Sequence, residues 1–151
     1  MRDVAVLGVG MHPFGKFSDK SVTDLCRTAV VAALADAGIA WREIEAVAAA
    51  SSRFSGGKGW GLNGNDVVED MGSSGIPVYN LSAGCSAGGN AFNIGYTLVA
   101  SGHHDVVLVV GGEKMPSTIG SGLSSRFPWR CRIIQRTTRA PSRRQAKNGA
   151  S

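Results

Sequence analysis

Cysteine is scarce in this chain of 151 residues, and its three copies, Cys26, Cys85 and Cys131, show no paired spacing. An odd number of cysteines without a CxxC pair argues against a disulfide framework and against a zinc ribbon, and it favours a reducing compartment. Long hydrophobic runs are lacking as well. The opening stretch MRDVAVLGVGMHPFG has one arginine and a short apolar run broken by glycines, which is too brief for a signal peptide or a membrane span. We therefore expect a cytoplasmic protein with no membrane span and no metal site.

Acidic residues are absent from the last 26 residues, which carry 8 basic groups, whereas residues 1–125 carry 8 basic and 11 acidic groups. Apart from Ile133 and Ile134, this final stretch has no apolar periodicity. The contrast predicts one domain over 1–116 and a disordered basic tail over 117–151. We expect no specific nucleic acid partner for the tail, because it has few interleaved aromatic residues. Its composition is typical of an altered reading frame in GC-rich DNA, and a frameshift is our hypothesis for its origin.

The first 112 residues alternate short β-branched runs with alanine-rich helical stretches. Such alternation predicts an α/β fold with a mostly parallel sheet and right-handed crossovers. The first helix is the best defined, because Ser21 and Asp24 form a capping-box pattern and Gly38 is placed to end the helix. The order is βαβαβαβ, and it ends before a typical sheet edge is complete. The expected strands are 4–7, 44–50, 76–80 and 105–112, and the other expected helices are 66–71 and 83–100.

Gly8 and Gly10 follow the first apolar run, Val4–Leu7, in a pattern that resembles part of a dinucleotide-binding fingerprint. However, Pro13 stands where that fingerprint needs glycine. About ten further residues precede the next helix, whose N-terminus would have to begin at once to meet a pyrophosphate. We therefore interpret the run as a strand buried on both faces and the glycines as a tight turn after it.

Cys85 lies between the third expected strand and the long helix, in the segment NLSAGCSAGGNA. The N–H groups and positive end of a helix favour a thiolate over a thiol, and backbone N–H groups in the same turn can hold an oxyanion. The glycines at 84, 88, 89 and 95 each cost roughly 1 kcal/mol in a helix, so we expect them to allow close packing or the approach of a ligand. Placement alone leaves two interpretations open, a catalytic nucleophile or an inert buried thiol such as we expect for Cys26.

Other polar residues carry no predicted role. His12 and the pair His103 and His104 lie in expected loops, where solvated or hydrogen-bonded imidazoles are the ordinary case. Glu113 and Lys114 follow the last expected strand, at the edge of a parallel sheet where active sites often lie. An exposed, ion-paired turn is the simpler interpretation of these two residues.

Four ordered segments together resemble the N-terminal half of the thiolase superfamily. They are VAVLGVGMHPFGKF (4–17), the first helix DLCRTAVVAALADAGI, NLSAGCSAGGNAF (80–92) and ASGHHDVVLVVGGEKMP (100–116). Within that superfamily the chain is most similar to sterol-carrier-protein-type thiolases, acetyl-CoA acetyltransferases and related lipid-transfer proteins. The resemblance predicts a thiolase-like N-terminal half-domain that stops near residue 116.

The resemblance implies that Cys85 is the catalytic nucleophile of an acyltransferase. It would take the acyl group of an acyl-CoA or 3-ketoacyl-CoA thioester as a covalent intermediate, which coenzyme A then releases. Coenzyme A enters as a substrate, and no bound cofactor is implied. In that family the general-base histidine, a second cysteine and part of the oxyanion hole come from the C-terminal half. Since no segment here resembles that half, we expect the chain to be inactive alone.

Two questions about partners remain open at this point. The resemblance implies an acyl-CoA or a sterol-derived CoA thioester as substrate, and a homo-oligomer or a partner subunit as the assembly. The alternative to an enzyme is a non-catalytic lipid-binding or acyl-CoA-binding subunit, which completes its fold against another chain because half a sheet sandwich exposes apolar surface.

Overall fold

The computed structural model describes residues 2–52, 61–72 and 74–114, together with the backbone of 129–136. Its strands are β1 (Val4–His12), β2 (Ala46–Ser51), β3 (Val78–Ser82), β4 (Val106–Gly111) and β5 (Trp129–Arg136). Its helices are α1 (Val22–Ala37), α2 (Gly64–Asp70) and α3 (Ala87–Ala100), with two short 3-10 turns, η1 (Trp41–Glu43) and η2 (Gly84–Ser86).

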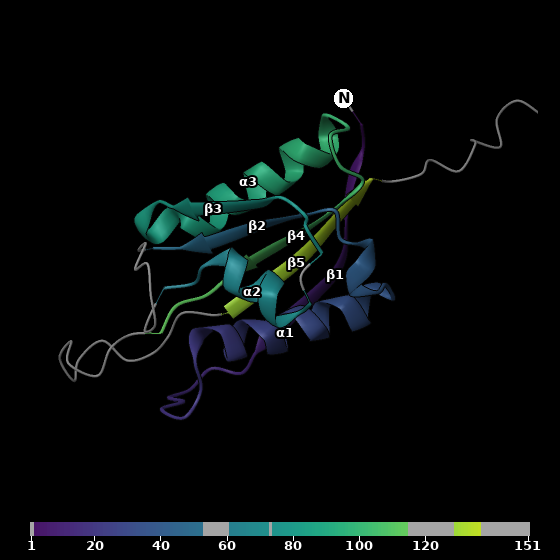
Figure 1. The fold of residues 1–151 in the computed structure, drawn as a ribbon. Helices are drawn as coiled ribbons and strands as arrows, with labels where there is room; N and C mark the ends of the chain where they lie inside the picture. Colours follow the sequence, from purple (N-terminus) through teal and green to yellow (C-terminus); the bar gives the residue numbers. More distant parts are fainter. Residues whose placement is uncertain (1, 53–60, 73, 115–128, 137–151) are drawn as a thin grey trace, which may run out of the picture.

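The five strands form one mixed sheet in the order β1-β5-β4-β2-β3. Strand β2 pairs in parallel with β3 and with β4. Strand β5 pairs antiparallel with both β1 and β4, so β1 runs in the same direction as β4. Helix α3 covers one face of the sheet, and α1 and α2 lie on the other (Figure 1). The predicted α/β fold with a mostly parallel sheet is confirmed.

Two hydrophobic clusters fill the spaces between these layers. One lies between the sheet and helices α1 and α2, and the other lies between the sheet and α3. Strand β2 is buried at all six positions because it contributes to both clusters. Its alanines have little strand preference of their own, so burial between two helical layers determines its conformation.

Helix α1 begins and ends as its sequence predicts. The Ser21 hydroxyl accepts from the backbone N–H of Asp24 at 3.1 Å, and the Ser21 N–H donates to the Asp24 carboxylate at 2.8 Å. Gly38 ends the helix in the left-handed conformation, at φ 68°. These bonds satisfy backbone groups that a helix terminus otherwise leaves without partners.

Gly8 and Gly10 lie inside β1, so the predicted tight turn after a short strand is wrong. A Cβ atom on Gly8 would stand 2.5 Å from the carbonyl oxygen of Ala33, and one on Gly10 would stand 2.1 Å from that of Ala29. The two glycines therefore let the backbone of α1 pack directly on the strand. Glycine between apolar residues indicates a turn or a close approach equally well, and only the packed helix distinguishes the two.

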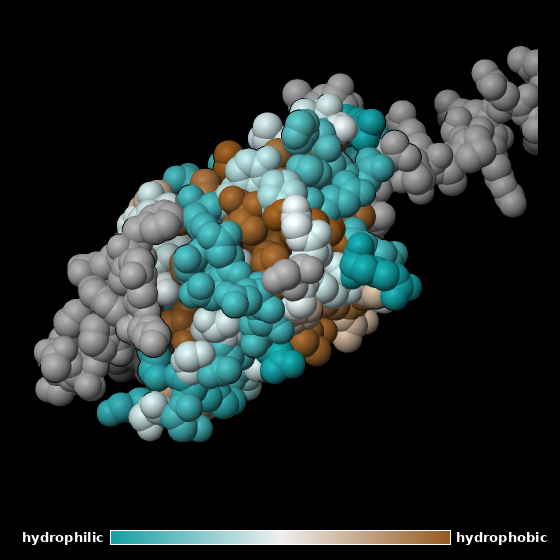
Figure 2. Space-filling model, viewed as in Figure 1, coloured by the Kyte–Doolittle hydropathy of each residue, from teal (hydrophilic) through white to brown (hydrophobic). Residues whose placement is uncertain are grey.

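The expectation that the first strand is buried on both faces is also wrong. Strand β1 lies at the edge of the sheet, and Val6, Val9 and Met11 are 45%, 55% and 47% exposed. Helix α1 covers the other face of β1, where Gly8 and His12 are buried. Among the described residues, α3 lies mainly over β2 and β4 and contacts β1 only slightly. Figure 2 shows further hydrophobic surface between α3 and α2, ringed by polar residues.

Strand β5 is the largest departure from the sequence-based prediction. It falls inside the segment for which we expected a tail of low order, and it lies between β1 and β4 as an interior strand of the sheet. Its pairing with β1 runs from Val4 opposite Arg136 to His12 opposite Trp129. A central strand is held by backbone hydrogen bonds to both neighbours, which apolar periodicity does not reveal. The rest of 117–151 lies outside the described residues.

Candidate functional site

Cys85 lies in the turn η2, between the carboxyl end of β3 and the start of α3. The predicted helix over 83–100 is thus divided, with a 3-10 turn over its first residues. The Cys85 side chain is exposed, and the preceding Gly84 has φ +54°, a backbone conformation that glycine adopts readily. The sequence located the thiol correctly at a strand-to-helix junction, and the structure adds that solvent reaches it.

The hydrogen bonds of this turn leave the start of α3 without a side-chain cap. Ser86 occupies the cap position, but its hydroxyl donates to the carbonyl oxygen of Ala83 at 2.7 Å. The Ser86 N–H bonds to the same oxygen at 3.1 Å, and the Ala87 N–H bonds to Gly84. The positive end of α3, which begins at Ala87 close to Cys85 in the chain, therefore carries no side-chain cap.

Two glycines enlarge the space beside Cys85. A Cβ atom on Gly88 or Gly89 would meet no atom of the described residues within 4 Å. The buried residues of α3 instead follow a separation of about one helical turn, as at Ala87, Ala91, Gly95 and Val99. The expectation that these glycines permit close packing thus fails at Gly88 and Gly89 within the described part of the chain.

Cys26 is the opposite case. It lies on the buried side of α1 and is fully inaccessible to solvent. Burial raises its pKa to about 12, because removal from water penalises the charged thiolate. The prediction that Cys26 is an inert core residue agrees with this placement.

The carboxyl ends of β4, β2 and β3 bring three further polar residues to the same end of the sheet as Cys85. Glu113 accepts from the backbone N–H of Ser52, and the Ser82 hydroxyl donates to the Ser52 carbonyl oxygen at 3.2 Å. Sequence reasoning assigned Glu113 to an exposed ion-paired turn and assigned no role to the two serines. The sequence signal that they share is their position just after or at the end of a predicted strand.

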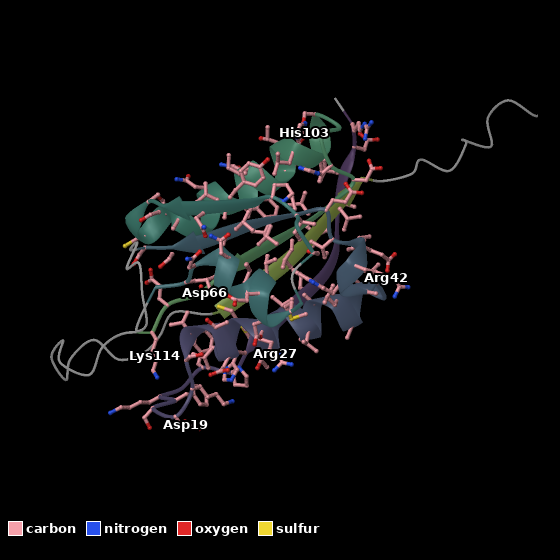
Figure 3. All side chains as sticks on the ribbon, viewed as in Figure 1. Asp19, Arg27, Arg42, Asp66, His103 and Lys114 are labelled. Carbon is pink, nitrogen blue, oxygen red and sulfur yellow. The ribbon has the colours of Figure 1, made fainter. Side chains whose placement is uncertain are left out.

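Lys114 also departs from the predicted ion-paired turn. Its ammonium donates to the backbone carbonyl of Lys20 at 2.6 Å, which ties the end of β4 to the loop after β1. Lys114 and Asp19 lie at the end of the molecule toward which β4 points, and His103 lies at the opposite end (Figure 3). The two ends of the sheet therefore carry separate polar groups.

His12 is a buried residue at the end of β1, and the prediction of a loop position is wrong. Its Nδ1 donates to the Pro13 carbonyl at 2.8 Å, and the Lys20 ammonium donates to its Nε2 at 3.2 Å. The Phe17 ring packs edge-on against the imidazole. These contacts explain the imidazole as a structural link between β1 and the loop that precedes α1.

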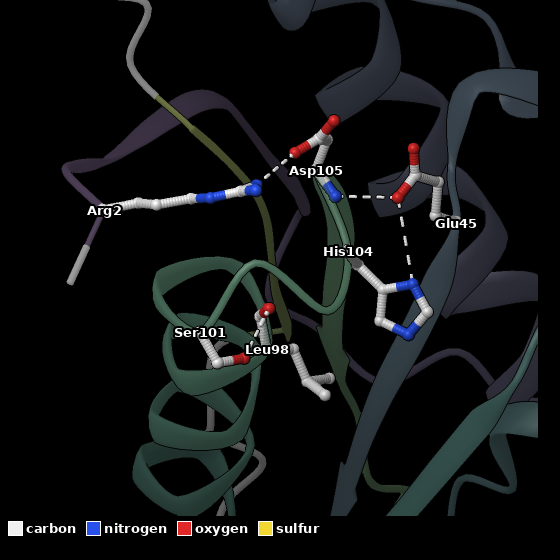
Figure 4. A network of polar contacts seen from close by, with 6 residues as sticks. All are labelled: Arg2, Glu45, Leu98, Ser101, His104 and Asp105. Atoms are coloured by element: carbon white, nitrogen blue, oxygen red, sulfur yellow. Dashed lines mark hydrogen bonds and ion pairs between the residues drawn. The ribbon is translucent and has the colours of Figure 1, made fainter.

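His104 belongs to a polar network at the amino ends of the strands (Figure 4). The Glu45 carboxylate accepts from the Asp105 N–H at 2.7 Å and lies 3.8 Å from Nδ1 of His104. Arg2 bonds the Asp105 carboxylate at 2.8 Å. No group of three or more His, Cys, Asp or Glu side chains suited to a metal ion occurs among the residues that the structure describes. The network anchors the N-terminus and the loop before β4.

Comparison with known proteins identifies the family to which this geometry belongs. The model of the family described as "Thiolase, N-terminal domain" matches residues 4–130. The chain belongs to the thiolase family. The match continues past residue 116, so the predicted end of the resemblance there is wrong, and it reaches the first residues of β5.

The curated relatives that the chain matches include acetyl-CoA acetyltransferases and sterol carrier proteins. It is 34% identical over 125 residues to an acetyl-CoA acetyltransferase from Methanothermobacter thermautotrophicus, covering 79% of this chain and 31% of the relative. It is 37% identical over 128 residues to sterol carrier protein 2 of Gallus gallus, covering 83% of this chain and 23% of the relative. This thiolase-family chain therefore spans less than a third of the length of these two relatives.

Solved structures show the same fold. A 3-oxoacyl-[acyl-carrier-protein] synthase III from Aquifex aeolicus superposes with a TM-score of 0.72 at 15% identity, over 90% of this chain and 55% of that one. An acetyl-CoA acetyltransferase from Syntrophomonas wolfei gives a TM-score of 0.63 at 23% identity, over 72% of this chain and 28% of that one. Within the described residues, no helix is both long and apolar enough to cross a membrane.

Proposed function

We propose that this thiolase-family chain carries the acyl-accepting half of an acyltransferase site, with Cys85 as the catalytic nucleophile. The observation that supports this most is the exposed thiol at the junction of β3 and α3, next to the uncapped start of a helix. The substrate is an acyl-CoA or 3-ketoacyl-CoA thioester, and coenzyme A is a reactant rather than a resident cofactor.

The proposed chemical step is the transfer of an acyl group from one sulfur to another. The Cys85 thiolate attacks the carbonyl carbon of an acyl-CoA, and a new carbon–sulfur bond forms as the bond to the coenzyme A sulfur breaks. Coenzyme A leaves as a thiolate and takes a proton from solvent. Attack by a second thiol reverses the step and restores Cys85.

Backbone groups around the thiol suit both charges that this step creates. The start of α3 has no side-chain cap, so its positive end can favour a thiolate before attack and an oxyanion after it. The open space at Gly88 and Gly89 leaves room for a substrate to approach the bare backbone.

We further propose that the 151-residue chain does not complete a catalytic cycle by itself. The described residues near Cys85 supply Ser52, Ser82 and Glu113, whereas the resemblance implies a general-base histidine and a second cysteine from a C-terminal half. The chain spans 31% of the archaeal acetyl-CoA acetyltransferase and 23% of the avian sterol carrier protein 2. We therefore expect acylation of Cys85 without sustained turnover.

Purified protein incubated with acetyl-CoA tests this proposal. We expect the release of free coenzyme A to stop after no more than one equivalent per chain, and a Cys85→Ala chain to release none. Sustained formation of acetyl-CoA from acetoacetyl-CoA and coenzyme A by the isolated chain would overturn the predicted inactivity. Equal release of coenzyme A with and without Cys85 would overturn its role as the nucleophile.

A second candidate function is a lipid-binding or acyl-CoA-binding subunit that pairs with another chain or with a second copy of itself. The exposed apolar positions Val6, Val9 and Met11 favour it, because a stable partner would cover them. Iodoacetamide labelling at pH 7 separates the two candidates. Fast alkylation of Cys85 while Cys26 stays unalkylated supports an enzymatic site, whereas slow alkylation of both supports a binding scaffold.

A further inference from the structure

A line of hydrogen bonds joins the carboxyl ends of β4, β2 and β3, which are consecutive neighbours in the sheet. Glu113, two residues after β4, accepts from the backbone N–H of Ser52, which follows β2. Ser82, the last residue of β3, donates its hydroxyl to the backbone carbonyl of Ser52 at 3.2 Å. Ser52 is therefore held through both of its backbone groups, by one side chain from each neighbouring strand.

Glu113 is itself held in place. The Ser51 hydroxyl donates to the same carboxylate oxygen at 3.4 Å, and the backbone of Glu113 forms an antiparallel bridge with Gly61. The residue is half-buried, and Ser51 beside it is 4% exposed. A hydrogen bond from a backbone N–H to a carboxylate in such surroundings is stronger than one between neutral groups.

The line ends beside the thiol. Only Ala83 and Gly84 separate Ser82 from Cys85, and Ser86 bonds back to the Ala83 carbonyl through both its N–H and its hydroxyl. These two bonds tie Ser86 to Ala83, the residue that follows Ser82 in the chain. A shift of Ser82 would move the start of η2 and, with it, the thiol relative to α3.

We propose that Glu113 is a positioning residue for the Cys85 thiol, acting through Ser52 and Ser82. This inference rests on the proposed function of Cys85. Glu113 works as a hydrogen-bond acceptor, so its charge is not required: a negative charge near the thiol would itself disfavour a thiolate. Glutamine has a side chain of the same length with an acceptor oxygen but no charge, whereas alanine has neither. Comparison of Glu113→Gln with Glu113→Ala therefore distinguishes the effect of the acceptor oxygen from the effect of the charge.

Amide hydrogen exchange of the full chain tests the structural link without any use of the thiol. Loss of one hydrogen bond changes a local opening equilibrium by about fivefold, so we expect Glu113→Ala and Ser82→Ala to speed exchange in the peptide over 83–87 by about that factor. Glu113→Gln, which keeps an acceptor oxygen, should exchange more slowly over 83–87 than Glu113→Ala, and α1 should exchange at the same rate in every variant. Unchanged exchange over 83–87 in Glu113→Ala or in Ser82→Ala would overturn the proposal. If Glu113→Ala does not fold, the Ser82→Ala chain tests the same line from its other end.

The alkylation rate of Cys85 tests the consequence for chemistry. At pH 7 we expect Glu113→Ala to be labelled about fivefold more slowly than the unmodified chain and Glu113→Gln at the same rate. A rate restored in Glu113→Gln but not in Glu113→Ala would assign the effect to the acceptor oxygen. Faster labelling of Glu113→Gln would show that the charge matters and would contradict the acceptor role. Labelling of the unmodified Cys85 no faster than glutathione would refute the proposed function instead, and the exchange result over 83–87 would still decide the link.

Discussion

The Cβ atom that Gly10 lacks would stand 2.1 Å from the carbonyl oxygen of Ala29, inside the backbone of α1. Helix and strand meet there with no side chain between them. The same holds at Gly8, where a Cβ atom would stand 2.5 Å from the carbonyl oxygen of Ala33. Backbone atoms cannot rotate away as the end of a flexible side chain can. The contact therefore fixes how closely α1 approaches the edge strand.

Replacement of Gly10 by alanine should lower the free energy of unfolding by about 3 kcal/mol, because α1 must move off the strand to accept a methyl group. Urea denaturation followed by circular dichroism measures this. Gly89→Ala is the matched control, since a Cβ there meets no described atom within 4 Å. It should raise the stability by about 1 kcal/mol, the ordinary gain in a helix. Equal effects of the two substitutions would contradict the close contact.

Cys26 should make the protein less stable in alkaline solution. Burial raises its pKa from 9.0 to about 12, so above pH 9 the unfolded chain loses a proton that the folded chain keeps. The free energy of unfolding then falls as the pH rises from 9 toward 12. Denaturation at several pH values should show a steeper alkaline decline for the unmodified chain than for Cys26→Ala. Parallel declines in the two chains would rule out this contribution.

The capping box of α1 should contribute stability that is lost in acid. Hydrogen bonds from the Ser21 side chain and backbone hold the pKa of Asp24 below its ordinary value of 3.8. Because the folded-state pKa is the lower one, this contribution is present above pH 3.8 and is lost as the pH falls through the folded-state pKa. Ser21→Ala should cost about 1 kcal/mol at pH 7 and should raise the pH of acid unfolding. An unchanged midpoint pH of acid unfolding would show that the capping box contributes no stability.

Two substitutions compare the strengths of contacts at the amino ends of the strands. Glu45→Ala removes the acceptor of the Asp105 N–H and should cost about 1 kcal/mol. Arg2→Ala removes an ion pair whose two side chains are 41% and 52% exposed, and it should cost less than about 0.5 kcal/mol because solvent screens it. Thermal or urea unfolding gives both values. A larger loss of stability in Arg2→Ala than in Glu45→Ala would contradict the expected order of the two contacts.

Local signals in the sequence predicted the elements that local interactions define. Ser21, Asp24 and Gly38 lie within or beside one helix, and the structure places each cap where the pattern predicts it. The same holds for the strand-to-helix junction that exposes Cys85, since both neighbouring elements have clear apolar patterns. Long-range pairing is different. The arginine-rich sequence of β5 gives no strand signal, and its place in the sheet depends on β1 and β4 on either side.

The supporting residues of the candidate site could not be predicted either, because they too are brought together by long-range pairing. Ser52, Ser82 and Glu113 come from three strands separated by about thirty residues each, a spacing typical of βαβ units, and nothing within any one segment pairs them. Position at the carboxyl end of a strand was the available signal, and it applied equally to Lys114, which instead bonds Lys20. Only the order of the strands in the sheet shows which loop ends meet.

Acetylation of the chain by acetyl-CoA, read by mass spectrometry, tests the central claim most directly. We expect the intact mass to rise by one acetyl group per chain, with the modification on the peptide that contains Cys85, formed faster than on glutathione under the same conditions. Cys26 should stay unmodified because it is buried. The Cys85→Ala chain should gain no acetyl group. A chain that stays unacetylated while iodoacetamide labels Cys85, or equal acetylation without Cys85, would contradict its role as the acyl acceptor.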